Sequence, residues 1–235
     1  MNDWVIRRTY GSIGHIFDGW MQSESMMVFI HTLFYRADWT NNFENSRTKQ
    51  DIFYDDNGQP HESLNKIFEL HGYNFRILFK PLKHSDFVSA IVLPRNGQKV
   101  KDILKNFKLN EMHTYFEQSK LMNVKFKMPK FKISRKDDLA QTLKKFGIID
   151  MFDPDLSDFG MMTNHSVFIG NLMQVINLDI GDMDQRAADE PEAMEMESSS
   201  ETYKFYVRKP FLFFVYSPVA NVALFSAVVT NPGIA

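Results

Sequence analysis

The side chains that usually perform catalysis or bind metals are present in this chain, but not at the spacings that those chemistries need. None of the seven histidines forms an H-x-x-x-H or H-E-x-x-H pair, the spacing that places two imidazoles on one helix face. No nucleophile elbow, phosphate-binding loop or dinucleotide-binding glycine pattern occurs. The chain has no cysteine, which excludes thiolate nucleophiles, thiolate metal sites and disulfides. We therefore expect no enzymatic activity, no metal and no cofactor.

Two short motifs carry some chemistry of their own. The sequence DPDLSD places Asp153, Asp155 and Asp158 close together, as in a calcium loop. It lacks the glycine and the terminal glutamate of an EF-hand, so these aspartates are better interpreted as turn residues. Asn164-His165-Ser166 is an acceptor sequon for N-glycosylation, which makes Asn164 a candidate modification site.

The bulk composition sets limits on the partners of the protein. The chain has 235 residues and a net charge of −2, so no overall basic field favours a nucleic-acid partner. The apolar run at 222–229 is far too short to span a membrane. The first residues, MNDWVIRRTYGS, do not have the charged-then-apolar layout of a signal peptide. We expect neither a nucleic-acid nor a membrane partner.

The most unusual segment is GDMDQRAADEPEAMEMESSSETYKF, at residues 181–205. It is acidic, contains a proline and has no apolar period, yet strand-like segments flank it on both sides. A connection of this length inside a compact domain is usually functional or disordered. It is therefore the first place to look for a functional site.

The segments around it are typical of an α+β fold with largely antiparallel sheets. Apolar runs predict strands at 26–39, 75–83, 87–94, 166–179 and, in two parts around Ser217-Pro218, at 210–229. The first of these is apolar on both faces, as expected for a strand in the middle of a sheet. Asn57-Gly58 predicts a hairpin, and 100–107 and 109–118 are typical of short helices.

The segment that follows is less regular. Apolar and basic residues alternate over 124–133, and Pro129 shifts the phase, which predicts an edge strand or a bulge. The residues from Ser134 to Asp137 match a capping box, which would begin a helix that Gly147 ends.

Several blocks of the sequence together resemble the serpin family. Residues 2–13 resemble its N-x-W-V … T-x-G-x-I segment, and Trp39, Phe43, Thr48 and Phe53 have the spacing that follows its buried tryptophan. The other matching blocks are AIVLP (90–94), MPKFKISRKDDLAQTLKKFGIIDMF (128–152), FYVRKPFLFFV (205–215) and LFSAVVTNP (224–232). They occur in the family's order and at its spacings across nearly the whole chain.

The resemblance implies a serpin-like fold with mainly antiparallel sheets, peripheral helices and an exposed reactive-centre loop. Because the match begins inside the family's domain, it also implies an N-terminally truncated chain: residues 1–235 form a partial serpin domain without the N-terminal helical part. Three residues depart from the family pattern. His31 replaces a buried asparagine of the central sheet, Arg208 an acidic or amide residue, and Ala227 a glycine. The implied activity is inhibition of a serine endopeptidase, and the implied location is extracellular.

The resemblance places the reactive-centre loop at 181–204, with Ile180, Gly181, Asp182 and Met183 as hinge candidates. In inhibitory serpins a protease cleaves this loop, whose N-terminal half then inserts into the main sheet as an extra strand. With Ile180 in place of the family's hinge glutamate, insertion would bury Met183, Gln185, Ala187, Asp189 and Pro191. With Asp179 there instead, it would bury Asp182, Asp184, Arg186, Ala188 and Glu190. Each register buries charge, which is costly when unpaired, and the first also places a proline in a central strand.

The scissile bond is predicted within 194–199. The candidate reactive-centre residues are Met194, Glu195, Met196, Glu197, Ser198 and Ser199. The methionines suit an elastase- or chymotrypsin-like protease, whereas Arg186 suits a trypsin-like one. Three alternatives stay open: an acidic loop that any protease cleaves, a non-inhibitory serpin that acts as a binding or carrier protein, and a degenerate truncated paralogue.

Overall fold

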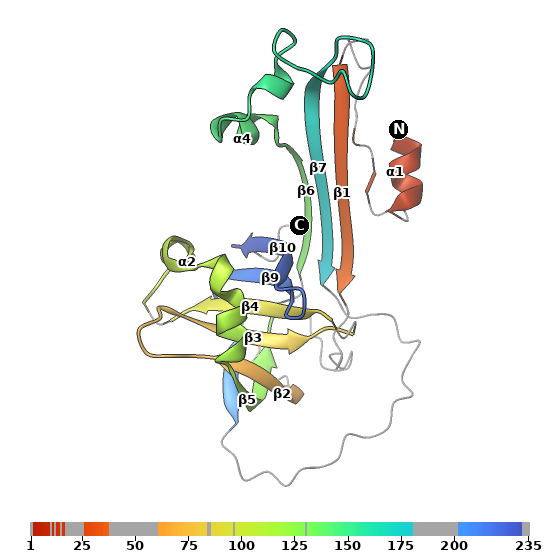
Figure 1. The fold of residues 1–235 in the computed structure, drawn as a ribbon. Coiled ribbons are helices and arrows are strands. Elements are labelled where there is room, and N and C mark those ends of the chain that lie inside the picture. The colour runs from red at the N-terminus through yellow and green to blue at the C-terminus, as the bar shows by residue number, and fades with distance from the viewer. Residues whose placement is uncertain are drawn as a thin grey trace. The chain divides into compact units, whose positions relative to one another are not determined.

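The computed structural model describes most of the chain outside the acidic segment (Figure 1). The described residues are 2–9, 11, 13–14, 16, 26–37, 61–83, 86–95, 97–129, 131–180 and 202–231. They divide into two compact units, one built from residues 1–36 and 132–179 and the other from 37–131 and 180–234, with Ala235 grouped with the first. Among the described helices, none is long and apolar enough to cross a membrane.

The first unit contains a three-stranded sheet in the order β1-β7-β6. Its elements are α1 (Asn2–Arg8), β1 (Met26–Ala37), β6 (Phe131–Asp138), α4 (Ala140–Lys145), the 3-10 helix η3 (Asp150–Phe152) and β7 (Phe168–Ile180). Two small apolar clusters stabilise it. Val5, Ile13, Ile16 and Val175 form one of them, and the other gathers around the buried side chain of Ile169. The helix α1 thus contributes to the same cluster as β7.

The second unit is a seven-stranded sheet in the order β10-β9-β4-β3-β2-β5-β8. Its strands are β2 (His61–Phe68), β3 (Phe75–Pro81), β4 (Val88–Pro94), β5 (Lys120–Lys127), β8 (Tyr203–Tyr206), β9 (Phe211–Ser217) and β10 (Val222–Val229). The helices between β4 and β5 are α2 (Val100–Asn106), the 3-10 helix η2 (Leu109–Glu111) and α3 (Met112–Glu117). All neighbouring strands are antiparallel except β5 and β8, which are parallel.

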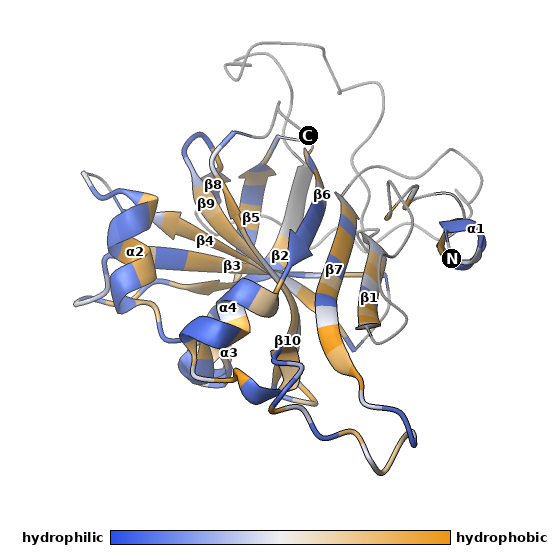
Figure 2. Cartoon of the chain, turned by 90° about the horizontal axis from the view of Figure 1, so that it is seen from above, coloured by the Kyte–Doolittle hydropathy of each residue, from blue (hydrophilic) through white to orange (hydrophobic). Residues whose placement is uncertain are grey.

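Aromatic rings fill the core between this sheet and its helices. Every residue of β9 is buried, and Figure 2 shows β4 and β9 in largely hydrophobic colours. On one face of the sheet, Phe68, Phe75 and Phe214 pack with Ile103 of α2 and Tyr115 of α3. Burial on both faces explains why β4 and β9 are near-continuous apolar runs rather than alternating ones.

Most of the elements expected from the sequence are present in the structure. The strands expected at 75–83, 87–94, 166–179 and 210–229 and the two short helices are confirmed within a few residues. Gly147 has a φ of +85° and follows Phe146, the C-cap of α4, as expected for a glycine that ends a helix. The Asn57-Gly58 hairpin and the block from Trp39 to Phe53 lie outside the described residues.

Three expectations were wrong in detail. The segment 124–133 is not one bulged strand: β5 ends at Lys127 and β6 begins at Phe131 in the other sheet. Ser134 does not cap a helix because it lies inside β6; the Asp138 carboxylate instead accepts a hydrogen bond from the Ala140 N–H (3.0 Å). Finally, β1 lies at the edge of the described sheet rather than in its middle, and its described side chains are at most half-buried.

Lys80 is an unusual residue in the core of the second unit. It lies in β3 with 4% of its surface exposed, and the Ser89 hydroxyl donates to its carbonyl oxygen (3.2 Å). Burial lowers the pKa of Lys80 from 10.5 to about 8 because the low-dielectric surroundings disfavour the ammonium form. Below pH 8 the folded protein therefore holds a charge that the unfolded chain solvates better, and this destabilises the fold.

We expect the Lys80→Met variant to be more stable at pH 7 by about 3 kcal/mol, the free energy that corresponds to the lowered pKa. The wild type should gain stability between pH 8 and pH 10 as Lys80 loses its proton in the folded state, and the variant should lack this gain. Urea unfolding of both proteins at each pH measures the difference. Lys101→Met, on the exposed side of α2, is the control and should follow the wild type. Parallel curves for wild type and Lys80→Met would contradict the prediction.

Candidate functional site

The candidate site from the sequence, the segment between β7 and β8, lies mostly outside the described residues. Ile180 is the last residue of β7, and the hinge candidates Gly181, Asp182 and Met183 follow beyond the described part. The six reactive-centre candidates at 194–199 also lie outside it, so their assignment stays a prediction. The structure does describe the two strands that hold the ends of the segment.

The strand that leads into the segment is the central one of its sheet. β7 has β1 on one side and β6 on the other, and Figure 1 shows β1 and β7 pointing in the same direction. The Asp138 carboxylate at the end of β6 accepts hydrogen bonds from the Asn171 amide (3.2 Å) and the Leu172 N–H (3.3 Å) near the start of β7. The start of β7 is thus fixed against β6.

A side-chain pair links β1 and β7 near their middle. The Gln174 amide nitrogen lies 3.1 Å from the His31 Nδ1, which accepts when the ring proton is on Nε2. His31 is exposed here, whereas the resemblance implied a buried asparagine at this position. On β7 itself, Val175 and Leu178 are buried. The contact between β1 and β7 therefore combines a polar side-chain pair with apolar packing.

The strand that leaves the segment is held by backbone pairing and by a buried ring. Tyr203 and Phe205 in β8 lie opposite Val124 and Phe126 in the parallel strand β5. Phe205 is fully buried, and its ring centroid lies 6.2 Å from that of Phe126. The Val207 N–H then donates to the Lys127 carbonyl oxygen (2.9 Å), which extends the pairing beyond β8.

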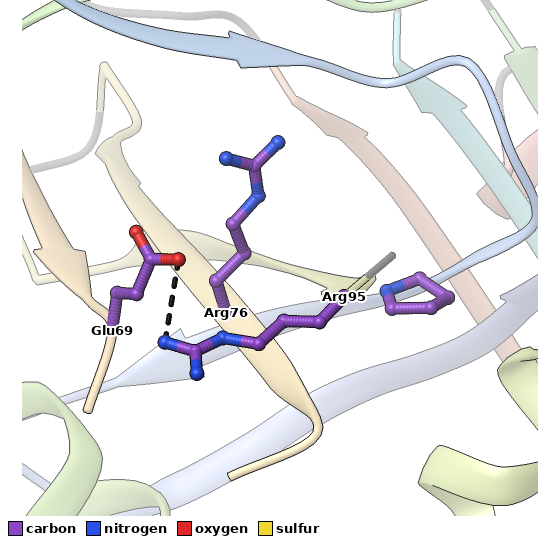
Figure 3. A pocket seen from close by; sticks show the side chains of 4 residues that line it. Glu69, Arg76 and Arg95 are labelled. Atoms are coloured by element: carbon purple, nitrogen blue, oxygen red, sulfur yellow. Dashed lines mark ion pairs between the residues drawn. The ribbon is translucent and has the colours of Figure 1, made fainter. Parts of the chain in front are cut away.

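Tyr203 is also fixed by a charged cluster at one end of β2, β3 and β4. Its hydroxyl donates to the Glu69 carboxylate and accepts from the Arg76 Nη1 (3.0 Å). Burial, together with the bond to Glu69, raises the pKa of Tyr203. Glu69 also forms an ion pair with Arg95 (3.3 Å), and Figure 3 shows the Glu69, Arg76 and Arg95 side chains. The sequence alone does not predict this cluster, because its only local signal is charged residues beside strand ends.

We expect Tyr203→Phe to lower the free energy of unfolding by about 1–2 kcal/mol, because the charged side chains of Glu69 and Arg76 both lose a hydrogen-bond partner at a partly buried site. Tyr206→Phe, in the same strand, is the matched control and should change it by less than about 0.5 kcal/mol. Thermal and urea unfolding measure both. Equal effects of the two variants would show that Tyr203 contributes only as an aromatic ring.

The remaining candidates behave as local turn and surface residues. The Asp153 carboxylate accepts from the Asp155 N–H (2.9 Å), and that of Asp158 accepts from the Gly160 N–H (2.9 Å). This confirms the turn interpretation of DPDLSD, and no group of three metal-binding side chains occurs in the described part of the chain. Asn164 is exposed before β7, so its glycosylation stays a prediction on an accessible side chain.

Comparison with known sequences identifies relatives along the whole chain. Serpin B4 from Homo sapiens is 25% identical over 246 residues, which cover 99% of this chain and 63% of the relative. Iripin-1 from Ixodes ricinus is 23% identical, over 98% of this chain and 61% of the relative. The chain thus spans less than two thirds of the length of these relatives.

Comparison with solved structures gives the same fold. The native state of the thermophilic serpin tengpin matches with a TM-score of 0.80 at 21% identity, over 98% of this chain and 62% of that one. Native protease nexin-1, solved with heparin, matches with a TM-score of 0.81 at 20% identity, over 98% and 65% of the two chains. The sequence profile described as "Serpin (serine protease inhibitor)" matches residues 1–232. This chain belongs to the serpin family.

Proposed function

We propose that this protein presents residues 181–204 as a bait loop to a serine endopeptidase. Members of its family are protease inhibitors rather than enzymes. The observation that carries the proposal is the arrangement around the two ends of the segment. It begins at the end of β7, the central strand of its sheet, and it ends at β8, which pairs with β5 and in which Tyr203 bonds to Glu69. A segment held at both ends is a suitable substrate for a protease cleft.

The contact between β1 and β7 is a suitable place for loop insertion. A chain that reversed direction after Ile180 and lay between the two strands would be antiparallel to both of them. Parallel pairs are slightly less stable per residue than antiparallel ones. Insertion would therefore replace one parallel ladder by two antiparallel ladders, at the loss of the contact between His31 and Gln174.

The side chains of the loop make this insertion less favourable. In one register an inserted strand would bury Asp189 and place Pro191 where a backbone donor is needed; in the other it would bury four charges. We therefore propose that cleavage usually releases the protease rather than trapping it. The protein would then act mainly as a protease substrate with the serpin architecture.

The proposed cleavage site is among residues 194–199, with Met196 as the residue before the scissile bond. A methionine there suits an elastase- or chymotrypsin-like pocket, and Glu195 and Glu197 beside it select against most other proteases.

The extracellular location rests on the family resemblance, and we propose it on that ground alone.

Incubation with pancreatic elastase, chymotrypsin and trypsin tests the proposal. We expect elastase or chymotrypsin to release a C-terminal fragment that begins at Glu197, identified by mass spectrometry, with little SDS-stable complex. Met196→Pro should abolish this fragment because proline at that position is a poor protease substrate. Met161→Ala is the matched control: Met161 is fully exposed in the first unit, and its loss should leave the fragment unchanged.

The other outcomes separate the alternatives. An abundant SDS-stable complex would show that trapping is efficient and would overturn the proposed substrate-like behaviour. Cleavage spread evenly over Arg186 and the acidic residues would overturn the assignment of Met196. Resistance of 181–204 to all three proteases would sink the bait-loop proposal itself.

A further inference from the structure

A cavity of about 580 Å³ lies in the second unit, at the end of the sheet where β2, β3 and β4 meet. It is lined by Glu69, which follows β2, by Arg76 on β3, and by Pro94 and Arg95 at the end of β4 (Figure 3). Its volume is in the range of small-molecule sites. The lining brings together residues from three strands, so the cavity depends on the fold rather than on one loop.

The cavity carries more positive than negative charge. Arg76 and Arg95 supply two guanidinium groups, and among the described lining residues Glu69 is the one carboxylate. Both oxygens of Glu69 are engaged, one with Arg95 (3.3 Å) and the other with the Tyr203 hydroxyl. Figure 3 shows that Arg95 reaches across to Glu69, while the guanidinium of Arg76 stands apart from this ion pair. Among the described lining residues there is therefore one more positive than negative charge.

An unsatisfied hydrogen-bond donor points to the same conclusion. The Nε of Arg95 is buried and has no hydrogen-bond partner among the described residues. A buried donor without an acceptor destabilises the fold by about 1–3 kcal/mol. The described lining residues therefore have more N–H donors than their own acceptors can satisfy.

Arg76 is held in place before any ligand arrives. Its Nη1 donates to the Tyr203 hydroxyl (3.0 Å), and its guanidinium lies over the rings of Tyr203 (5.7 Å) and Phe205 (4.9 Å). Stacking of this kind fixes the plane of the guanidinium and leaves further N–H groups for another acceptor. A guanidinium fixed in this way binds carboxylate or phosphate oxygens at a reduced entropic cost.

We propose that this cavity is a binding site for a small anionic molecule, recognised through a carboxylate or phosphate group by Arg76 and Arg95. The guanidinium groups of two arginines that line one cavity match the planar geometry of a carboxylate and the tetrahedral oxygens of a phosphate. The volume leaves room for the rest of a small molecule beside the anionic group. The proposal does not require cleavage of residues 181–204, although Glu69 and Arg76 also hold Tyr203 at the end of that segment.

NMR titration of the arginine Nε–Hε signals tests this site, with inorganic phosphate and acetate as the two probes at constant ionic strength. We expect saturable shifts of the Arg95 and Arg76 signals, and the stronger of the two probes identifies the preferred anionic group. Arg95→Gln should weaken binding of that probe at least tenfold. Glu69→Gln should strengthen it several-fold because it removes the competing carboxylate.

Arg208→Gln is the matched control. Arg208 is an exposed arginine of the same unit that lies over the Tyr206 ring (5.4 Å) but does not line the cavity. The variant should bind the probe as the wild type does. Absence of saturable shifts in the wild type, or equal weakening by Arg208→Gln and Arg95→Gln, would overturn the proposal. A gain of affinity in Glu69→Gln also separates ligand binding from a merely structural role of the cluster.

Discussion

Replacement of Phe75 by alanine is expected to lower the free energy of unfolding of the second unit by about 3–5 kcal/mol, the usual cost of removing a buried phenylalanine ring. Phe75 begins β3 with 1% of its surface exposed. Its ring centroid lies 5.4 Å from those of Tyr73 and Phe107, 5.6 Å from that of Tyr115 and 6.2 Å from that of Phe68. These rings come from three separate parts of the chain, so a cavity at their centre cannot be closed by one local shift.

Urea unfolding followed by near-ultraviolet circular dichroism measures this change. Leu121→Ala is the control in the same unit; Leu121 is 64% exposed on β5, and its replacement should alter the free energy of unfolding by less than about 0.5 kcal/mol. The change also bears on the proposed anion site, because Arg76 follows Phe75 directly in β3. A cost below about 1 kcal/mol for Phe75→Ala would mean that the ring cluster repacks freely and does not hold the sheet to its helices.

The parts of the fold that could be predicted from the sequence are those that a local sequence pattern determines. The strands β4 and β9 are nearly continuous apolar runs because both of their faces are covered, and this pattern is visible in a single segment. Gly147 could be predicted as a helix end because a positive φ favours glycine whatever the tertiary contacts. The resemblance to a family added the order of the segments.

The features that were predicted wrongly or missed all depend on contacts between distant segments. Alternation across 124–133 indicates a strand on each side of Pro129, but not that the chain changes sheets there. Ser134 fits a capping box locally, yet the residues around it gain more from pairing within β6. The anchor of Tyr203 joins it to Glu69 and Arg76, more than a hundred residues earlier in the chain. No local spacing encodes such a contact.

The register of the loop is the question with the largest functional consequence. We expect the combined variant Gln185→Ala, Asp189→Ala and Pro191→Ala to change cleavage from release of the protease to trapping. If Ile180 occupies the hinge position, this variant inserts only Met183, the native Ala187 and the three new alanines, so no polar side chain or proline is buried. Removal of one unpaired buried charge relieves roughly 3 kcal/mol, which corresponds to a change of about 100-fold in the ratio of trapped to released protease.

The matched variant for the other register replaces Asp182, Asp184, Arg186 and Glu190 by alanine and leaves the first set untouched. Only the variant that corresponds to the true register should form an SDS-stable complex with elastase or chymotrypsin. It should also raise the melting temperature after cleavage, because an inserted strand completes two antiparallel ladders beside β1 and β7. If both variants form the SDS-stable complex, the net charge of the loop rather than its register opposes insertion. If neither variant forms the complex, the contact between β1 and β7 opposes insertion. Gln174→Ala, which removes the side-chain contact with His31, is then the next variant to measure.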